Sequence, residues 1–259
     1  MDDEAFIEYV GNTLGSLPGV EAVSLGGSRA EGTNRPDSDW DFSIYYRGDF
    51  DPHTLRELGW PGTVGELGSW SSVSHTVFNG GAWLTIDGRA SDVHYRDLDV
   101  VERVIEDATD GRFTTEPLWF HLAPLPSYLV MAELASKRVL VGTLPDVTYP
   151  GALRQHASDE WWRQAAAELD YARRYPAAAG RLTQCVGLLA RATTCTAHAV
   201  LAARGIWVTN EKRLFARAGL NGIDELIATA EPDPASLIAL VDDVRSYCAE
   251  KLRAARAED

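Results

Sequence analysis

The pattern of residues changes between Leu144 and Pro150, and this change constrains the fold more than any other feature of the 259-residue chain. Before it, short apolar or alternating segments between Gly-containing turns predict strands, interspersed with amphipathic helices. After it, strand signals disappear and helical periodicity in Ala and Leu continues to the end. We therefore predict an α+β protein with two domains, 1–148 and 149–259, the second an α-helical bundle.

The individual elements follow from periodicity and turn residues. Strands are expected at 20–25, 39–46, 82–86, 89–95 and 139–141. Helices of the first domain are expected at 3–17, at 98–110 and just before Lys137. Residues 60–72 are expected to form a long loop that could act as a lid. In the second domain, long helices are expected at 152–175, 181–203 and 235–256, with shorter ones at 210–218 and 222–230.

The charge balance limits the partners. The chain has 38 acidic and 24 basic residues, which gives a formal net charge of −14. An acidic surface repels phosphate backbones, so nucleic acid is not an expected substrate, whereas cationic small molecules or basic proteins would be attracted.

The cysteines and the absence of targeting signals indicate the cellular location of the protein. The three cysteines, Cys185, Cys195 and Cys248, are widely spaced and lack zinc-ligand spacing. The acidic N-terminus does not have the pattern of a signal peptide, and no apolar run approaches the roughly 20 residues that span a bilayer. We expect a cytoplasmic protein that does not associate with membranes.

A glycine-rich turn and two aspartates form the strongest chemical motif. Gly26-Gly27-Ser28 follows the first strand, and Asp39-Trp40-Asp41 comes ten residues later. Backbone N–H groups of such a turn, with the Ser28 hydroxyl, can approach phosphate oxygens. Arg29 could also contact phosphate, although a surface ion pair is equally compatible with its position. Asp39 and Asp41 alternate with Trp40 on a strand, so both carboxylates project to one side, where hard oxygen ligands suit Mg²⁺.

A third carboxylate is expected on a neighbouring strand. Asp92 lies inside the segment 89–95, with Val93 and Tyr95 on the opposite face. It would complete the metal site with Asp39 and Asp41, and it could accept a proton from a hydroxyl nucleophile. His94 shares the Asp92 face and could line the site, although the sequence favours a hydrogen-bonded structural histidine.

These motifs resemble the nucleotidyltransferase superfamily typified by DNA polymerase beta, whose pattern is Gly-Gly-Ser/Thr, Asp-x-Asp and a later strand carboxylate. The resemblance covers about the first 100 residues. It implies a mixed, mostly five-stranded sheet, two Mg²⁺ ions held by Asp39, Asp41 and Asp92, and phosphate binding at Gly27, Ser28 and Arg29. It also implies a nucleotide triphosphate donor, with ATP as the default.

The order of the domains resembles the streptomycin-type adenylyltransferases, in which a helical bundle follows the transferase domain. If Thr209 caps the next helix, Lys212 lies in its first turn, where a bound phosphate would offset the unfavourable helix dipole, although a solvent-facing lysine paired with a nearby acid is equally compatible with its position. By the resemblance, Lys212, in the stretch 203–212, would reach the triphosphate. This implies transfer of AMP to a hydroxyl of an aminoglycoside-like antibiotic, hence antibiotic resistance. One departure counts against that acceptor: the stretch 175–181 lacks the acidic residues that hold the cationic drug, and the acidic-aromatic residues 159–162 would have to replace them.

Other functions remain open. The spacing of Arg191 and His198 fits a helical-domain ribonuclease of the toxin–antitoxin type, and a related alternative is a nucleotidyltransferase that modifies a partner protein. A protein with only a binding or scaffold role would not need the three carboxylates. The sequence does not determine the acceptor, the base of the donor, the general base or the oligomeric state.

Overall fold

The computed structural model describes residues 1–68 and 77–258, and the chain divides into two compact units. The sheet unit comprises Met1–Glu106 and Ser127–Thr148, and the helical unit comprises Asp107–Pro126 and Tyr149–Asp259. The predicted boundary after residue 148 placed 107–126 in the first domain, whereas the structure groups this segment with the helices.

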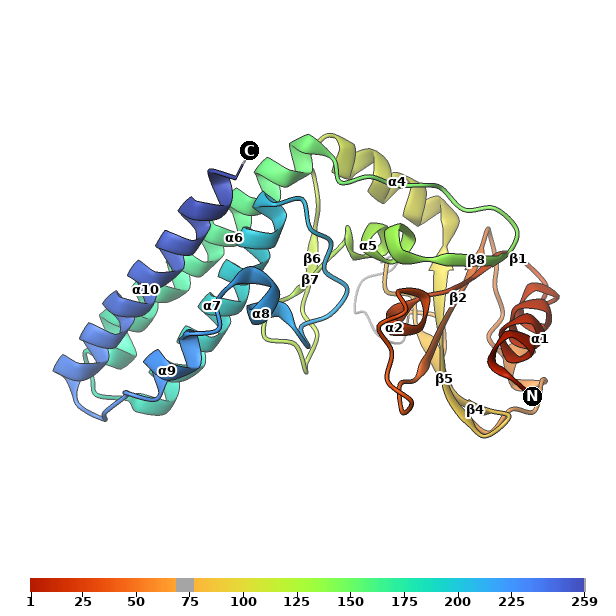
Figure 1. Cartoon of the computed structure of the whole chain (residues 1–259), viewed down its shortest axis with the longest axis horizontal. Coiled ribbons are helices and arrows are strands. Elements are labelled where there is room, and N and C mark those ends of the chain that lie inside the picture. Colours follow the sequence, from red (N-terminus) through yellow and green to blue (C-terminus); the bar gives the residue numbers. More distant parts are fainter. Residues whose placement is uncertain (69–76, 259) are drawn as a thin grey trace. The chain divides into compact units, whose positions relative to one another are not determined.

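The sheet unit is built on a mixed six-stranded sheet in the order β3-β4-β5-β2-β1-β8 (Figure 1). β2 and β5 pair in parallel, and all the other neighbours are antiparallel. The strands are β1 (Val20–Leu25), β2 (Trp40–Tyr46), β3 (Gly62–Val64), β4 (Gly81–Ile86), β5 (Arg89–Asp97) and β8 (Arg138–Val141). This confirms the predicted α+β class with its mixed sheet.

The predicted number of five strands was wrong, because β3 lies in the segment 60–72 that was expected to be a loop. β3 is only three residues long and begins at a glycine, so it carries no alternating pattern that a sequence could reveal. Its strand character comes from pairing with β4 at the edge of the sheet. Residues 69–72 of the expected loop lie outside the described residues.

The helices of the sheet unit are α1 (Asp3–Gly15), α2 (Gly27–Ala30), α3 (His53–Arg56) and α5 (Leu129–Ser136), and α4 (Leu98–Thr109) leads out of it. Asp2 caps α1 by accepting a hydrogen bond from the Ala5 amide at 2.9 Å. Asp97 caps α4 by accepting hydrogen bonds from the Asp99 and Val100 amides. Both helix starts are therefore fixed by local side-chain chemistry.

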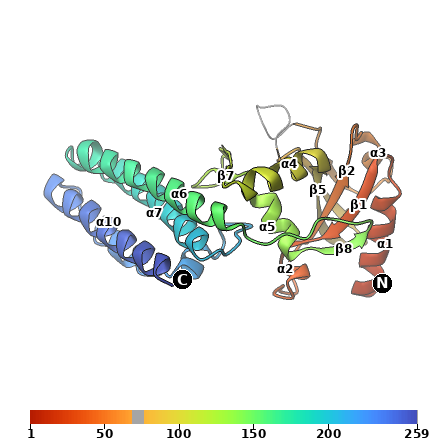
Figure 2. The same ribbon diagram turned by 90° about the horizontal axis from the view of Figure 1, so that it is seen from above.

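Helix α1 covers one face of the sheet and contacts β1 and β8 (Figures 1 and 2). Its buried residues Phe6, Val10 and Leu14 belong to one core with Trp40 and Phe42 of β2. Phe6 packs edge-on against Trp40, with their ring centroids 4.8 Å apart. Because side chains alternate along a strand, burial of Trp40 and Phe42 directs Asp41 to the other face.

On the other face, an ion pair between a buried arginine and a partly buried glutamate joins the sheet to α5. Arg96 of β5 is 4% exposed, and its Nε and Nη2 donate to the two carboxylate oxygens of Glu133 at 2.8 and 2.7 Å. Burial by itself would raise the pKa of Glu133, but the Arg96 guanidinium lowers it below its usual value. Asp92, His94 and Arg96 occupy every second position of β5 and so share one face of the sheet. The Arg96–Glu133 pair therefore anchors the face that carries Asp92.

Replacing Arg96 by Met should lower the free energy of unfolding by about 3–5 kcal/mol, because Glu133 would be left buried and unpaired. The loss should shrink as the pH falls and Glu133 becomes protonated. Urea unfolding at several pH values measures this. The control is Arg138→Met, which removes the exposed pair with Glu4 and should change stability little. Equal losses in the two variants would contradict the prediction.

The helical unit is built mainly from three long helices, α6 (Gly151–Ala172), α7 (Leu182–Ala203) and α10 (Pro234–Arg256), which run side by side in both views (Figures 1 and 2). A π-helical turn, η1 (Arg173–Ala177), ends α6, and α8 (Leu214–Ala218) and α9 (Ile223–Ile227) are short. β6 (Thr115–Glu116) and β7 (Leu125–Pro126) form a small hairpin that the sequence did not predict.

Helix α7 has the length and composition of a membrane-spanning segment. It has 22 residues, and its most apolar window has a mean hydropathy of 1.3, which differs from the expectation that no apolar run is long enough to span a bilayer. Yet 72% of that window is buried, against α6 and α10 among other elements. Such burial is typical of a core helix, because an all-round apolar helix can be covered by protein as well as by lipid.

Candidate active site

The turn after β1 brings the backbone against an aspartate of β2. The Gly26 amide donates to the Asp41 carbonyl at 2.7 Å, which continues the β1–β2 pairing into the turn. Gly27 has φ +61°, and a Cβ atom built there would lie 1.9 Å from Asp41 Oδ2. Only glycine fits, because any side chain would displace the Asp41 carboxylate. Gly27 therefore has a steric purpose beyond the phosphate contact expected from sequence.

Two aspartates and one histidine converge on the open face of the sheet. Asp41 of β2 is in register with Asp92 of β5, and Ser43 is in register with His94. Since the two strands are parallel and adjacent, side chains of one face lie about 4.8 Å apart. One possible ligand atom from each of Asp41, Asp92 and His94 lies within 4.8 Å of the others. The three partly buried groups could hold a metal ion.

The local environment favours a neutral imidazole at His94. Burial lowers the pKa of His94 to about 4, and the positive charge of Arg96 acts in the same direction. A neutral imidazole has a nitrogen lone pair that can bind a metal ion. Small neighbours flank the ring, since Ser43 and Gly81 are the residues in register with His94 on the two adjacent strands.

Asp39 lies apart from this group. It precedes β2, its side chain is exposed, and the group that could hold a metal does not include it. The pairing of β2 with β5 begins one residue later, at Trp40 and Ser91. Its role as a metal ligand stays a prediction.

The structure gives Arg29 other partners than phosphate. Arg29 is the third residue of the four-residue helix α2, and its guanidinium donates to the carbonyls of Ser38 and Asp39. The Cζ atom of Arg29 also lies 3.9 Å from the centroid of the Trp40 ring, above its face. Ser28 lies in the same helix and is partly buried. Its contact with phosphate remains a prediction.

Lys212 lies in a turn of the helical unit and is exposed. The helix expected from residue 210 begins only at Leu214, so the expectation that Thr209 caps it was wrong. The reason is local: the Asn210 side chain accepts a hydrogen bond from the Lys212 amide at 3.0 Å and stabilises a turn instead. The reach of Lys212 to a triphosphate remains a prediction.

The acidic-aromatic stretch 159–162 does not form an open acidic cluster. Asp159 pairs with Arg256, Glu160 pairs with Arg163, and Trp161 is fully buried. An aminoglycoside site at this stretch would require both ion pairs to open.

The ribonuclease pair is likewise not assembled. Arg191 pairs with Glu168 at 2.9 Å, while His198 is 7% exposed and stacks on Trp161. Burial lowers the pKa of His198 to about 4. A general acid or base needs access to its substrate, so this geometry disfavours the ribonuclease hypothesis.

Comparison with known proteins defines the class. Residues 7–71 match the family model described as a nucleotidyltransferase domain, a stretch that includes Gly27, Asp39 and Asp41 and ends before Asp92. The chain thus carries a nucleotidyltransferase domain and is an enzyme of the nucleotidyltransferase class, which confirms the resemblance inferred from the motifs.

No curated protein matches the chain. Among solved structures, a nucleotidyltransferase-like protein from Exiguobacterium sibiricum 255-15 aligns with a TM-score of 0.47 and 8% identity, covering 96% of this chain and 75% of that one.

Replacing Gly27 by Ala should abolish transferase activity, because the new Cβ must displace the Asp41 carboxylate. The matched control is Gly32→Ala: Gly32 also has a left-handed backbone, with φ +67°, but its Cβ would meet nothing within 4 Å. Both variants carry a backbone strain of roughly 1–2 kcal/mol, so only the clash separates them. Thermal unfolding and nucleotide transfer should be measured together, and comparable activity of the two folded variants would refute the steric assignment.

His94→Ala should change which divalent ions bind. Imidazole favours ions such as Co²⁺ and Zn²⁺, whereas carboxylates suffice for Mg²⁺. The variant should therefore lose more affinity for Co²⁺ than for Mg²⁺, as measured by calorimetric titration without nucleotide. The visible absorption spectrum of bound Co²⁺ should also change. An unchanged spectrum and unchanged affinities would exclude His94 as a ligand.

Proposed function

We propose that this protein transfers a nucleoside monophosphate, AMP from ATP, to a hydroxyl group of a small molecule in a reaction that depends on Mg²⁺. The observation that carries the proposal is the alignment of Asp41 with Asp92 on adjacent parallel strands, beside the Gly26-Gly27-Ser28 turn. The matched nucleotidyltransferase domain supports a nucleotide triphosphate as the donor.

The chemistry is a displacement at the α-phosphorus. The acceptor hydroxyl oxygen forms a new P–O bond, the bond to the β-phosphate breaks, and pyrophosphate leaves. The acceptor proton passes to a carboxylate, for which Asp92 is our candidate. Asp41 and Asp92, joined by Asp39 in the proposed complex, would hold two Mg²⁺ ions. These would neutralise the phosphates and make the hydroxyl more acidic.

The acceptor is proposed from charge. A formal net charge of −14 favours the approach of cationic molecules, so aminoglycoside-like antibiotics are the first class to test. Such an activity would confer antibiotic resistance.

A partner protein is the second candidate acceptor. Trp119 is fully exposed and Phe120 is 71% exposed, in the loop between β6 and β7 of the helical unit. Two hydrogen bonds from the Leu122 and Ala123 amides to Glu211 hold this loop. Exposed aromatic side chains of this kind favour contact with another protein.

A reducing, cytoplasmic location is proposed on the cysteines. All three are free and buried, and burial raises the pKa of each thiol, that of Cys195 to about 12. None is arranged as a disulfide that would stabilise the described structure outside the cell.

Asp41→Asn and Asp92→Asn should each lower transfer by at least about a hundredfold, because each replaces a negatively charged Mg²⁺ ligand by a neutral amide and so weakens the binding of the ions that neutralise the phosphates. We expect the same of Asp39→Asn. The matched control is Asp37→Asn, on the same loop, which removes only an exposed carboxylate paired with Arg35. ATP binding is measured by titration with and without Mg²⁺. Nucleotide transfer is then assayed with antibiotic and protein acceptors.

Full metal-dependent turnover in Asp41→Asn or Asp92→Asn would refute the proposed metal site. Label on a protein rather than on a small molecule would move the acceptor to the second candidate. Cleavage of RNA, with no transfer, would favour the ribonuclease alternative.

A further inference from the structure

The residues that carry this inference lie at the start of β2, where the chain enters the sheet with the Asp39-Trp40-Asp41 motif. Asp41 is held inside the sheet by pairing with β5, but this pairing begins at Trp40 and does not include Asp39. Another interaction must therefore fix the backbone of Asp39 if its carboxylate is to join Asp41 in a metal complex.

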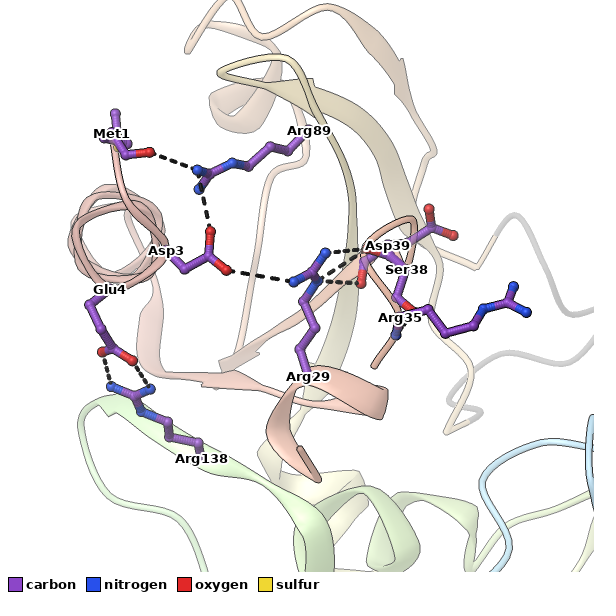
Figure 3. Close-up of polar contacts among 9 residues, drawn as sticks. All are labelled: Met1, Asp3, Glu4, Arg29, Arg35, Ser38, Asp39, Arg89 and Arg138. Atoms are coloured by element: carbon purple, nitrogen blue, oxygen red, sulfur yellow. Dashed lines mark hydrogen bonds and ion pairs between the residues drawn. The ribbon is translucent and has the colours of Figure 1, made fainter. Parts of the chain in front are cut away.

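Arg29 provides this interaction. Its Nε donates to the Ser38 and Asp39 carbonyls at 3.1 and 3.2 Å, and its Nη2 donates to the Ser38 carbonyl at 2.7 Å. Figure 3 shows the guanidinium directed at both carbonyls, while the Asp39 carboxylate points away from it. A guanidinium that donates hydrogen bonds to two consecutive carbonyls fixes the peptide in both position and orientation. One hydrogen bond alone could not do so.

The guanidinium itself is fixed from two further sides. It stacks 3.9 Å above the Trp40 ring, and its Nη1 lies 3.8 Å from Asp3 Oδ2. The other oxygen of Asp3 lies 3.4 Å from Arg89 Nη2, so this carboxylate sits between two arginines (Figure 3). The Arg29 side chain is only 11% exposed. Its direction is therefore set by α1 and β2 together.

Arg29 also connects two parts of the site. It belongs to α2, directly after Ser28 of the glycine-rich turn, and its side chain reaches the residues before β2. The hydrogen bonds from Arg29 therefore set the spacing between the turn that is expected to bind phosphate and the backbone that carries the Asp39 carboxylate. The surface ion pair that the sequence offered is present with Asp3, but it does not account for the hydrogen bonds to the Ser38 and Asp39 carbonyls. The phosphate contact stays a prediction.

We propose that Arg29 is a positioning residue that holds the Asp39 backbone so that the Asp39 carboxylate can join Asp41 and Asp92 at the metal. This inference rests on the proposed function. Arg29 touches neither metal nor nucleotide in this scheme and acts only through Asp39.

The test compares Arg29→Met with two arginine controls. Met keeps apolar contact with Trp40 but cannot donate to the carbonyls. Arg35→Met removes an exposed arginine of the same loop, paired with Asp37, and Arg138→Met removes another ion pair of α1, with Glu4. Mn²⁺ affinity is measured by electron paramagnetic resonance without nucleotide, and kcat and KM for ATP are measured at saturating metal.

Arg29→Met should weaken Mn²⁺ binding by about tenfold and lower kcat by about ten- to a hundredfold, with a smaller change in KM, because a small misplacement of a reacting group is costly. Arg29→Lys should recover part of the loss, since an ammonium can donate to one carbonyl but lacks the fork. The two control variants should stay within about twofold of the wild type.

A double-mutant cycle with Asp39→Asn separates positioning from general stability. If Arg29 acts through Asp39, Arg29→Met should change Mn²⁺ affinity by less than about twofold in the Asp39→Asn background. Additive losses, or a fall in folded fraction that accounts for the whole effect, would overturn the inference.

The outcomes also separate the inference from the proposed function. A wild type that binds Mn²⁺ without transferring nucleotide would overturn the function, and the Mn²⁺ cycle would still decide the role of Arg29. Normal transfer with an unaffected Arg29→Met variant would overturn the inference alone. A wild type that binds no Mn²⁺ would overturn both.

Discussion

The parallel pairing of β2 with β5 is the constraint on which the site depends. It is the one parallel contact in the described six-stranded sheet, and it aligns Asp41 with Asp92 although 51 positions separate them in the chain. The core fixes this register, because a shift of one residue would turn Trp40 and Phe42 out of the apolar layer beneath α1. The stability of the fold and the geometry of the carboxylates are thus set by the same strand register.

Other residues around Asp41 and Asp92 keep these two carboxylates in place. Gly27 has no side chain, so the Asp41 carboxylate can lie against the turn that follows β1. Arg29, two residues later, grips the carbonyls just before β2. On the same face of β5, the Arg96–Glu133 pair anchors α5 next to His94. The face that carries Asp41 and Asp92 is therefore supported by contacts that the sequence motifs do not include.

Much of the fold could be predicted, because local patterns decide it. The alternation of Trp40 and Phe42 with Asp41 predicted a strand with an apolar face. The Asp87-Gly88 turn between β4 and β5 has the positive φ at both residues that a two-residue hairpin turn requires. The long helices of the second unit follow from their periodicity. β3 escaped prediction since an edge strand of three residues exists through pairing rather than pattern. The start of α8 escaped it because an asparagine side chain stabilised a turn.

The sequence by itself determined the class of chemistry, because the glycine-rich turn, the paired aspartates and a further carboxylate on a later strand together indicate a nucleotidyltransferase, although each motif alone is common. Only the tertiary structure decided which groups meet. It placed His94 beside Asp41 and Asp92, left Asp39 outside the strand pairing, and turned Arg29 towards backbone carbonyls. The physical reason is that residue spacing specifies the face of an element, whereas proximity between elements depends on strand order and register, which are properties of the whole sheet.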